Sequence, residues 1–291
     1  EEPKSFDFLA RPVGGDQVKL MRYSRSKRTW SVPEAVSEPG QDIMRAAAAV
    51  DGSKRLWVIW SAMRDGNFDL FARSWAKGRW SAISRLTSDA GQDINPVAAA
   101  DTKGRVWLAW QAFRNGNLEI LAAVQQGDRF SRETAVSFSA ASDWDPAIAA
   151  APDGSVAVAW DTFDKGDYDV YTRRLRLERT IRMEAPVPIA ASALFEARPS
   201  IAFDRQNRLW VAYEASGVKW GKDFGAYETT GIALYQGHTL KVRCLDGANL
   251  LASGPELDEA LPGPAAARAR RQAQAPGAPW PNPQLASKRL P

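Results

Sequence analysis

Cysteine and histidine are almost absent from this sequence. Its 291 residues include one of each, Cys244 and His238. A single cysteine cannot form an intrachain disulfide, and a single histidine cannot supply a two-histidine metal site. No apolar run approaches the ~18 residues of a membrane-spanning helix, and no glycine-rich phosphate-binding loop is present. We therefore expect no transmembrane segment, no metal site and no cofactor.

A strong excess of one charge is also missing. The net charge is +4, and no basic block lies in the repeated part of the chain described below. Proteins that bind nucleic acid usually carry such a block, so we expect no nucleic-acid partner. The chain opens on Glu1-Glu2 rather than on methionine. This start indicates either a mature form after removal of a signal or a fragment of a longer protein.

One stretch, residues 91–123, shows the unit from which the chain is built. Three short strands are expected in it, at 96–100, 106–110 and 118–123, separated by two tight turns. Gly104 can take the left-handed conformation that the first turn requires, and Asn115-Gly116 is a strong hairpin pair in the second. The unit therefore predicts antiparallel strands joined by short turns.

The same unit recurs about every 50 residues, with Trp60, Trp110, Trp160 and Tyr213 at one position. A period of this length with short strands is typical of a β-propeller, with one blade per repeat. We predict an all-β propeller of about five four-stranded blades, or six or more if the chain is a fragment. The propeller is expected over residues 1–254 and a Pro/Ala/Arg-rich linker over 255–280.

Blade 1 starts differently from the other blades. Its second, third and fourth strands are expected at Phe6–Leu9, Gln17–Tyr23 and Arg28–Val32, so the inner strand is missing. Residues 281–286 resemble the start of an inner strand. Residues 281–291 are therefore either a strand that closes the ring or a disordered tail. In the second case, the chain would stop inside a longer propeller.

The turn pattern Trp110-x4-Asn-Gly-Asn-x-Glu119, with Asp65-Gly-Asn-x-Asp69 and Gly166-Asp-Tyr-Asp169, resembles TolB-like and sialidase-like propeller repeats of bacterial secreted proteins. Residues 198–224 resemble propeller regions of bacterial exported proteins that carry a PHP-type domain. The resemblance implies a periplasmic or extracellular protein. The metal motif of the PHP domain is absent from this sequence, and Ser88-Asp-Ala-Gly91 lacks the tryptophan of the sialidase Asp-box, so neither activity carries over.

Candidate binding residues gather at one face of such a propeller, where the loops entering the inner strands meet the turns between second and third strands. The first set contributes Asp93, Asp143, Asp145 and Glu196, and the second set contributes Arg64 and Arg114. These side chains either bind a polar ligand or cation, or they cap strand ends and join blades. The pair Asp143 and Asp145 falls short of the 6–8 oxygens that calcium takes, so no metal is assigned to it.

The connection from Glu214 to His238 is much longer than its counterparts in the other blades. Loops beyond about 12–15 residues are usually functional or disordered. This one contains the aromatic residue Trp220 and the charged residues Lys222 and Asp223, whereas disordered segments have few aromatic residues. We predict that it folds over the acidic face and binds a ligand or partner there, with a lid that only covers a neighbouring blade as the alternative.

Two functions remain open on the sequence alone. The first is a non-catalytic binding or scaffold module for a protein partner or glycan, in peripheral contact with a larger assembly. The second is an extracellular carbohydrate-active enzyme, either a sialidase-like glycoside hydrolase or a lyase. Tyr213-Glu214 is a Tyr–Glu pair of the kind a sialidase uses, but adjacent residues on a strand point to opposite faces. We therefore expect binding and assign no catalytic residue.

Overall fold

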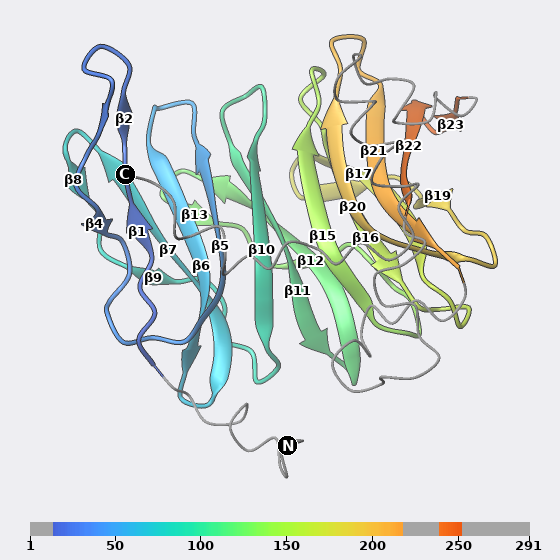
Figure 1. Cartoon of the computed structure of the whole chain (residues 1–291), viewed down its shortest axis with the longest axis horizontal. Coiled ribbons are helices and arrows are strands. Elements are labelled where there is room, and N and C mark those ends of the chain that lie inside the picture. The colour runs from blue at the N-terminus through green and yellow to red at the C-terminus, as the bar shows by residue number, and fades with distance from the viewer. Residues whose placement is uncertain (1–13, 218–238, 252–291) are drawn as a thin grey trace, which may run out of the picture.

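A computed structural model describes residues 14–217 and 239–251, and these residues fold into antiparallel sheets arranged as blades (Figure 1). The described part of the chain contains no helix that could cross a membrane. Four of the predictions lie outside the described residues. These are the strand at 6–9, the binding residues Trp220, Lys222 and Asp223, the linker at 255–280 and the closing strand at 281–286.

Blades 2, 3 and 4 share one plan, in which the inner, second and third strands form a continuous antiparallel ladder and the fourth strand is broken into two short pieces. Blade 2 consists of β5 (Ile43–Val50), β6 (Leu56–Arg64), β7 (Asn67–Ala76), β8 (Arg79–Trp80) and β9 (Ser84–Arg85). Blade 3 consists of β10 (Asp93–Ala100), β11 (Val106–Arg114), β12 (Asn117–Gln126), β13 (Arg129–Phe130) and β14 (Thr134–Ala135). Blade 4 consists of β15 (Asp143–Ala150), β16 (Val156–Thr162), β17 (Asp169–Leu177), β18 (Ile181–Met183) and β19 (Val187–Ala190).

The first and last blades follow the same plan as far as they are described. Blade 1 contributes β1 (Lys19–Leu20), β2 (Tyr23–Ser24), β3 (Thr29–Trp30) and β4 (Glu34–Ala35), which pair as a third and a fourth strand. Blade 5 contributes β20 (Phe195–Phe203), β21 (Leu209–Ser216), β22 (Thr239–Asp246) and β23 (Asn249–Leu250). The predicted all-β fold with about five blades is confirmed.

Large side chains between the blades form the core. Trp60, Trp110, Trp160 and Tyr213 are all buried, as expected for one repeated packing position. Each buried cluster draws on two successive blades, so the blades pack face to face. The inner strands β5, β10, β15 and β20 lie side by side in chain order. Burying an aromatic side chain of this size stabilises a fold by about 3–5 kcal/mol, judged from its truncation to alanine.

Aspartate turns close one end of the blades, which we call the turn face. Asp101 accepts hydrogen bonds from the side chains of Arg105 (Nε, 2.7 Å) and Trp107 (Nε1, 2.9 Å), and Asp51 and Asp204 do the same with their own Arg and Trp. Burial opposes ionisation of Asp101, but these hydrogen bonds hold its pKa below the ordinary value. The aspartates of these turns are used to connect strands. We therefore look for a ligand site at the opposite end of the blades.

A bulge at the opposite end of each inner strand changes the direction of the chain. The register shifts between Ile94 and Val97 in blade 3 and at the corresponding points of blades 2, 4 and 5. Asn95, Asp145 and Arg198 occupy these bulges with φ values of 53°, 48° and 54°. Bulges re-aim side chains and occur often beside functional sites. In blade 5, the backbone N–H of Arg198 at this bulge donates to Asp161 Oδ2 of blade 4 at 2.8 Å, so the bulge joins neighbouring blades.

Candidate functional site

The site face, which we call the loop face, carries the turns between second and third strands and the loops that enter the inner strands. Two asparagines join these two sets across neighbouring blades. Asn67 donates from Nδ2 to the carbonyl of Asp89 (2.9 Å), and Asn117 donates in the same way to the carbonyl of Ala141 (2.8 Å). Both sets of loops therefore lie on one face, as the sequence predicted.

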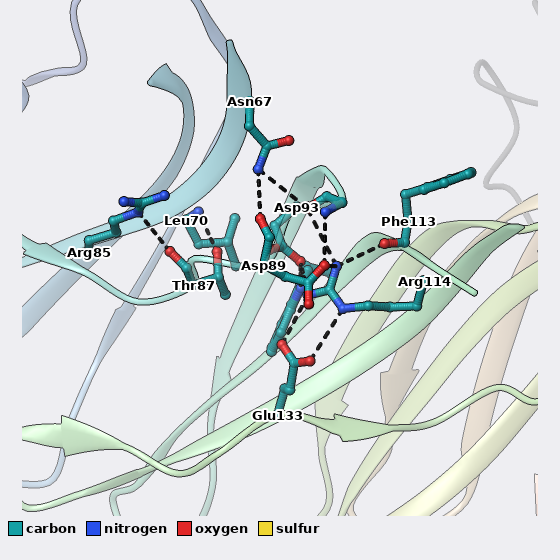
Figure 2. Close-up of polar contacts among 11 residues, drawn as sticks. Asn67, Leu70, Arg85, Thr87, Asp89, Asp93, Phe113, Arg114 and Glu133 are labelled. Carbon is teal, nitrogen blue, oxygen red and sulfur yellow. Dashed lines mark hydrogen bonds and ion pairs between the residues drawn. The ribbon is translucent and has the colours of Figure 1, made fainter. Parts of the chain in front are cut away.

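Arg114, at the end of β11, is the centre of a cluster of charged residues on this face (Figure 2). Its Nη2 lies 2.9 Å from Asp93 Oδ1 and 3.0 Å from Glu133 Oε2, and its Nη1 lies 3.6 Å from Asp89 Oδ1. Asp93 also accepts a hydrogen bond from Trp110 Nε1 at 2.7 Å. Arg114 thus ties the start of β10 to the loops around it, and the predicted residues Asp93 and Arg114 come together.

Arg64 occupies the matching position in blade 2 but is not part of such a cluster. Its side chain is 58% exposed and lies 3.7 Å from Asp65, whereas the side chain of Arg114 is 12% exposed. The two blades share one register, but Ile43 stands opposite Ala62 where blade 3 has Asp93 opposite Ala112. Without an aspartate in that place, nothing draws Arg64 inward. Arg64 and Arg114 thus have different surroundings, and Arg64 stays a predicted binding residue.

Asp42, the acidic neighbour of Ile43, does not occupy the place of Asp93 either. Its Oδ1 accepts a hydrogen bond from the Gly14 backbone N–H at 2.8 Å. Asp143 and Glu196 do take the position of Asp93 in blades 4 and 5, opposite Thr162 and Ala215. The acidic row is thus present in three blades rather than in four.

Carboxylates from neighbouring blades approach each other at two junctions. Asp143 lies near enough to Glu119 of blade 3 for its charge to raise the pKa of Glu119, and the charge of Asp169 in blade 4 raises the pKa of Glu196 in the same way. Burial is the largest cause that raises the pKa of Asp143, and it also raises the pKa of Glu119, to which the charge of Asp143 adds. Ser137 bridges the first junction by donating to Glu119 Oε2 at 2.9 Å.

The buried acids of this face keep part of their hydrogen-bonding capacity. One carboxylate oxygen of each of four residues is buried without a hydrogen-bond partner among the described residues, and the four are Asp69, Asp93, Asp143 and Asp169. Burial raises the pKa of each of these groups. Asp145 lies at the bulge, outside this row, and is only half-buried. In the described ranges, acidic, histidine and cysteine side chains form no group that could hold a metal ion.

Two grooves open between blades near these residues. One, of about 450 Å³, lies between blades 2 and 3 and is lined by Thr87, Asp89 and Glu133 among others. The other, of about 200 Å³, lies between blades 3 and 4 and is lined by Phe138, Asp143 and other residues. Two phenylalanines on this face are exposed. Phe138 lines the second groove and is 66% exposed, and Phe113, beside Arg114, is 45% exposed.

Several of these residues were missed by the sequence analysis. Asp89, Glu133 and Phe138 are not repeated from blade to blade, so the repeat did not mark them, and Phe113 recurs only as Phe163 in blade 4. A repeated hydroxyl could have found three of the blade junctions. Ser37, Thr87 and Ser137 are spaced by 50 residues, and each accepts a hydrogen bond from the backbone of the third strand, at Val18, Leu70 and Ile120.

No protein-family model matches the sequence, and no curated protein matches it either. Solved structures do match. A PL25 polysaccharide lyase, an ulvan lyase bound to -[GlcA(1-4)Rha3S]-, is 10% identical with a TM-score of 0.53, over 86% of this chain and 71% of that chain. An α-L-arabinofuranosidase of Fusarium graminearum bound to an iminosugar inhibitor is 12% identical with a TM-score of 0.52, over 73% of this chain and 65% of that chain.

A third match is the Hadza microbial sialidase Hz136, which is 12% identical with a TM-score of 0.47, over 73% of this chain and 46% of that chain. The chain thus spans less than half of the sialidase and about two thirds of the arabinofuranosidase. At these identities the matches show the fold alone. Together with the repeated four-stranded sheets, the lyase and the arabinofuranosidase define the molecule as a β-propeller.

Proposed function

We propose that this protein is an exported, non-catalytic glycan-binding propeller that takes its ligand on the loop face. The fold supports a carbohydrate ligand, because the ulvan lyase and the arabinofuranosidase that share it are both described as carbohydrate-active enzymes. A periplasmic or extracellular location follows from the same proposal, since such ligands are found outside the cell.

The burial of the acidic side chains is the observation that supports binding without catalysis. Asp93 and Asp143 are fully buried at the blade junctions, where Asp93 binds Arg114 and Trp110 and Asp143 accepts from Ser139 (3.1 Å). A catalytic acid or nucleophile has to reach the substrate, and a glycosidase needs two such carboxylates at a defined separation. Carboxylates that join blades serve the fold instead.

The exposed phenylalanines supply the binding part of the proposal. Phe138 presents apolar ring surface at the groove between blades 3 and 4, and Phe113 is exposed next to Arg114 at the end of β11. Flat aromatic surface next to a few polar groups suits ligands with one apolar and one polar face, as pyranose rings have. Arg173 lies under Phe138, with its Cζ 5.1 Å from the ring centroid, and holds that ring in place.

Calorimetric titration with arabinan and ulvan oligosaccharides tests this proposal. We expect Phe113→Ala and Phe138→Ala each to weaken binding about tenfold, which corresponds to about 1.4 kcal/mol. Trp30→Ala is the matched control, because Trp30 is an exposed aromatic residue of blade 1 that lies away from both grooves. Equal losses in all three variants, or undisturbed binding in both phenylalanine variants, would show that the loop face is not the site.

A hydrolase or lyase is the second candidate, and one observation favours it. Asp143 and Glu119 face each other with raised pKa values, and carboxyl groups of this kind act as general acids in glycosidases. Their use in catalysis would require the junction between blades 3 and 4 to open. Formation of new reducing ends or of unsaturated products from the same oligosaccharides would establish this candidate instead.

A further inference from the structure

An arginine side chain crosses two of the blade junctions. Arg73 of blade 2 donates from Nη1 to the carbonyl of Val36 in blade 1 at 3.0 Å. Arg173 of blade 4 donates in the same way to the carbonyl of Val136 in blade 3 at 2.5 Å. The guanidinium of Arg73 lies over Trp80, with its Cζ 5.3 Å from the ring centroid. Both junctions are therefore crossed by an arginine that donates to the equivalent carbonyl, whereas Arg173 has Phe138 of blade 3 as its aromatic neighbour.

The junction between blades 2 and 3 lacks this arginine. Ala123 holds the position there, and Leu86 corresponds to Val36 and Val136, because each of the three donates its backbone N–H to the third strand of its own blade. A methyl group cannot reach the Leu86 carbonyl. The groove at this junction has a volume of about 450 Å³, against about 200 Å³ where Arg173 is present.

The walls of this groove repeat the surroundings of Arg73. Leu86, Ala123 and Phe130 line it. Phe130 pairs with Gln125 at the place where Trp80 pairs with Trp75 in blade 2, so it offers a ring where Arg73 has one. The groove thus presents a carbonyl, an aromatic ring and an apolar wall in the arrangement that holds a guanidinium elsewhere in the same molecule.

The charges at the rim also favour a cation. Asp89 and Glu133 line the groove and have side chains that are nearly half exposed. They share Arg114 with the buried Asp93, so three carboxylates surround one guanidinium (Figure 2). Arg132 is exposed at the same rim and offsets one of these charges. The residues that line the groove therefore include two carboxylates and one arginine.

We propose that the groove between blades 2 and 3 binds the side chain of an arginine on an extended segment of a partner protein. A guanidinium suits it better than an ammonium, because its planar fork can bond the Leu86 carbonyl and a rim carboxylate together while it lies over Phe130. The groove is larger than one guanidinium, so it has room for the arginine's stem and neighbouring residues. The glycan is proposed to bind beside Phe138 at the other groove, between blades 3 and 4, so the two proposals can be tested separately.

Fluorescence anisotropy with a labelled Gly-Gly-Arg-Gly-Gly peptide tests this inference. Two companion peptides replace the arginine by lysine or by citrulline, which keeps the shape of arginine without its charge. We expect the arginine peptide to bind at least ten times more tightly than the citrulline peptide and to weaken as salt increases. Equal binding of the arginine and citrulline peptides would overturn the proposal.

Variants locate the site. Ala123→Arg should fill the groove as Arg73 and Arg173 fill theirs, so we expect binding to be lost while the melting temperature stays equal or rises. Val32→Arg is the control, because it adds the same charge at an exposed position of blade 1. Glu133→Gln should weaken binding about fivefold, and Arg132→Ala should strengthen it. Unchanged affinity in folded Ala123→Arg, or in Glu133→Gln if the first variant does not fold, contradicts the proposed site.

A competition experiment separates a partner segment from a small ligand. N-acetylarginine amide is titrated against the bound arginine peptide. The proposal predicts that it competes at least ten times more weakly than the unlabelled peptide, since it lacks the neighbouring residues. Equal potency would mean that the groove takes a small guanidinium compound, and the partner-protein part of the proposal would then be wrong.

Discussion

Asp143 and Asp204 show how opposite environments set the ionisation of two aspartates in one fold. Burial raises the pKa of Asp143 on the loop face. On the turn face, the hydrogen bond from Trp210 is the largest cause that lowers the pKa of Asp204, to about 2. A raised pKa favours the neutral acid in the fold, so that contribution to stability is full below the unfolded pKa of about 4 and is lost as pH rises through the folded value. A lowered pKa has the reverse effect, and stability is lost as pH falls from about 4 to about 2.

Asp143→Asn tests this difference at the residue scale. The variant removes a charge that burial disfavours, so we expect a higher free energy of unfolding at pH 7 and a weaker loss of stability as pH rises above about 4. The pKa of Glu119 should also fall, because the charge of Asp143 helps to raise it. Denaturant titration over a pH series and NMR of the Glu119 carboxyl measure both effects.

The matched control is Asp204→Asn on the turn face, for which the opposite sign is expected. Its carboxylate is stabilised in the fold, so the variant should be less stable at pH 7 and should lose less stability on acidification. If Asp143→Asn behaves like Asp204→Asn, then Asp143 is a charged structural partner in the fold, and the account of the buried acidic row is wrong.

At the scale of single elements, the strands could be predicted but their register could not. Trp110 and its equivalents, together with the turn glycines, gave the strand order. The bulge in each inner strand is invisible to that pattern and interrupts the alternation of side chains between the two faces. β5 and β10 share one register, and the surroundings of Arg64 differ from those of Arg114 because Ile43 stands where blade 3 has Asp93. The sequence likewise does not show that Arg73 and Arg173 cross blade junctions, because this depends on how the blades pack.

Two turn glycines give a prediction about the elements that join strands. A Cβ on Gly104 would lie 2.4 Å from the Cα of Gly52 in the neighbouring blade, whereas a Cβ on Gly116 would have nothing within 4 Å. Both have positive φ, at 75° and 97°. We expect Gly116→Ala to cost about 1–2 kcal/mol from backbone strain alone, and Gly104→Ala to cost at least about 1 kcal/mol more. Equal losses in denaturant titration would show that the turns of blades 2 and 3 are not in close contact.

At the scale of the whole molecule, the propeller was predictable from the repeat because every blade solves the same packing problem. The residues of the candidate site were less predictable, because Phe138, Asp89 and Glu133 belong to single blades. The predicted binding loop at 214–238 and the closing strand at 281–286 extend outside the described residues and stay predictions. The function proposed for the molecule rests on its fold and on the burial of its acids.

Binding and product formation measured in the same sample test the central claim most directly. The protein is saturated with an arabinan or ulvan oligosaccharide, and the bound and free fractions are analysed by mass spectrometry over many hours. The account predicts saturable binding that Phe138→Ala weakens about tenfold, with the oligosaccharide recovered at its original mass. Shorter or unsaturated products, formed in proportion to protein and lost in Asp143→Asn, would contradict it and identify the protein as an enzyme.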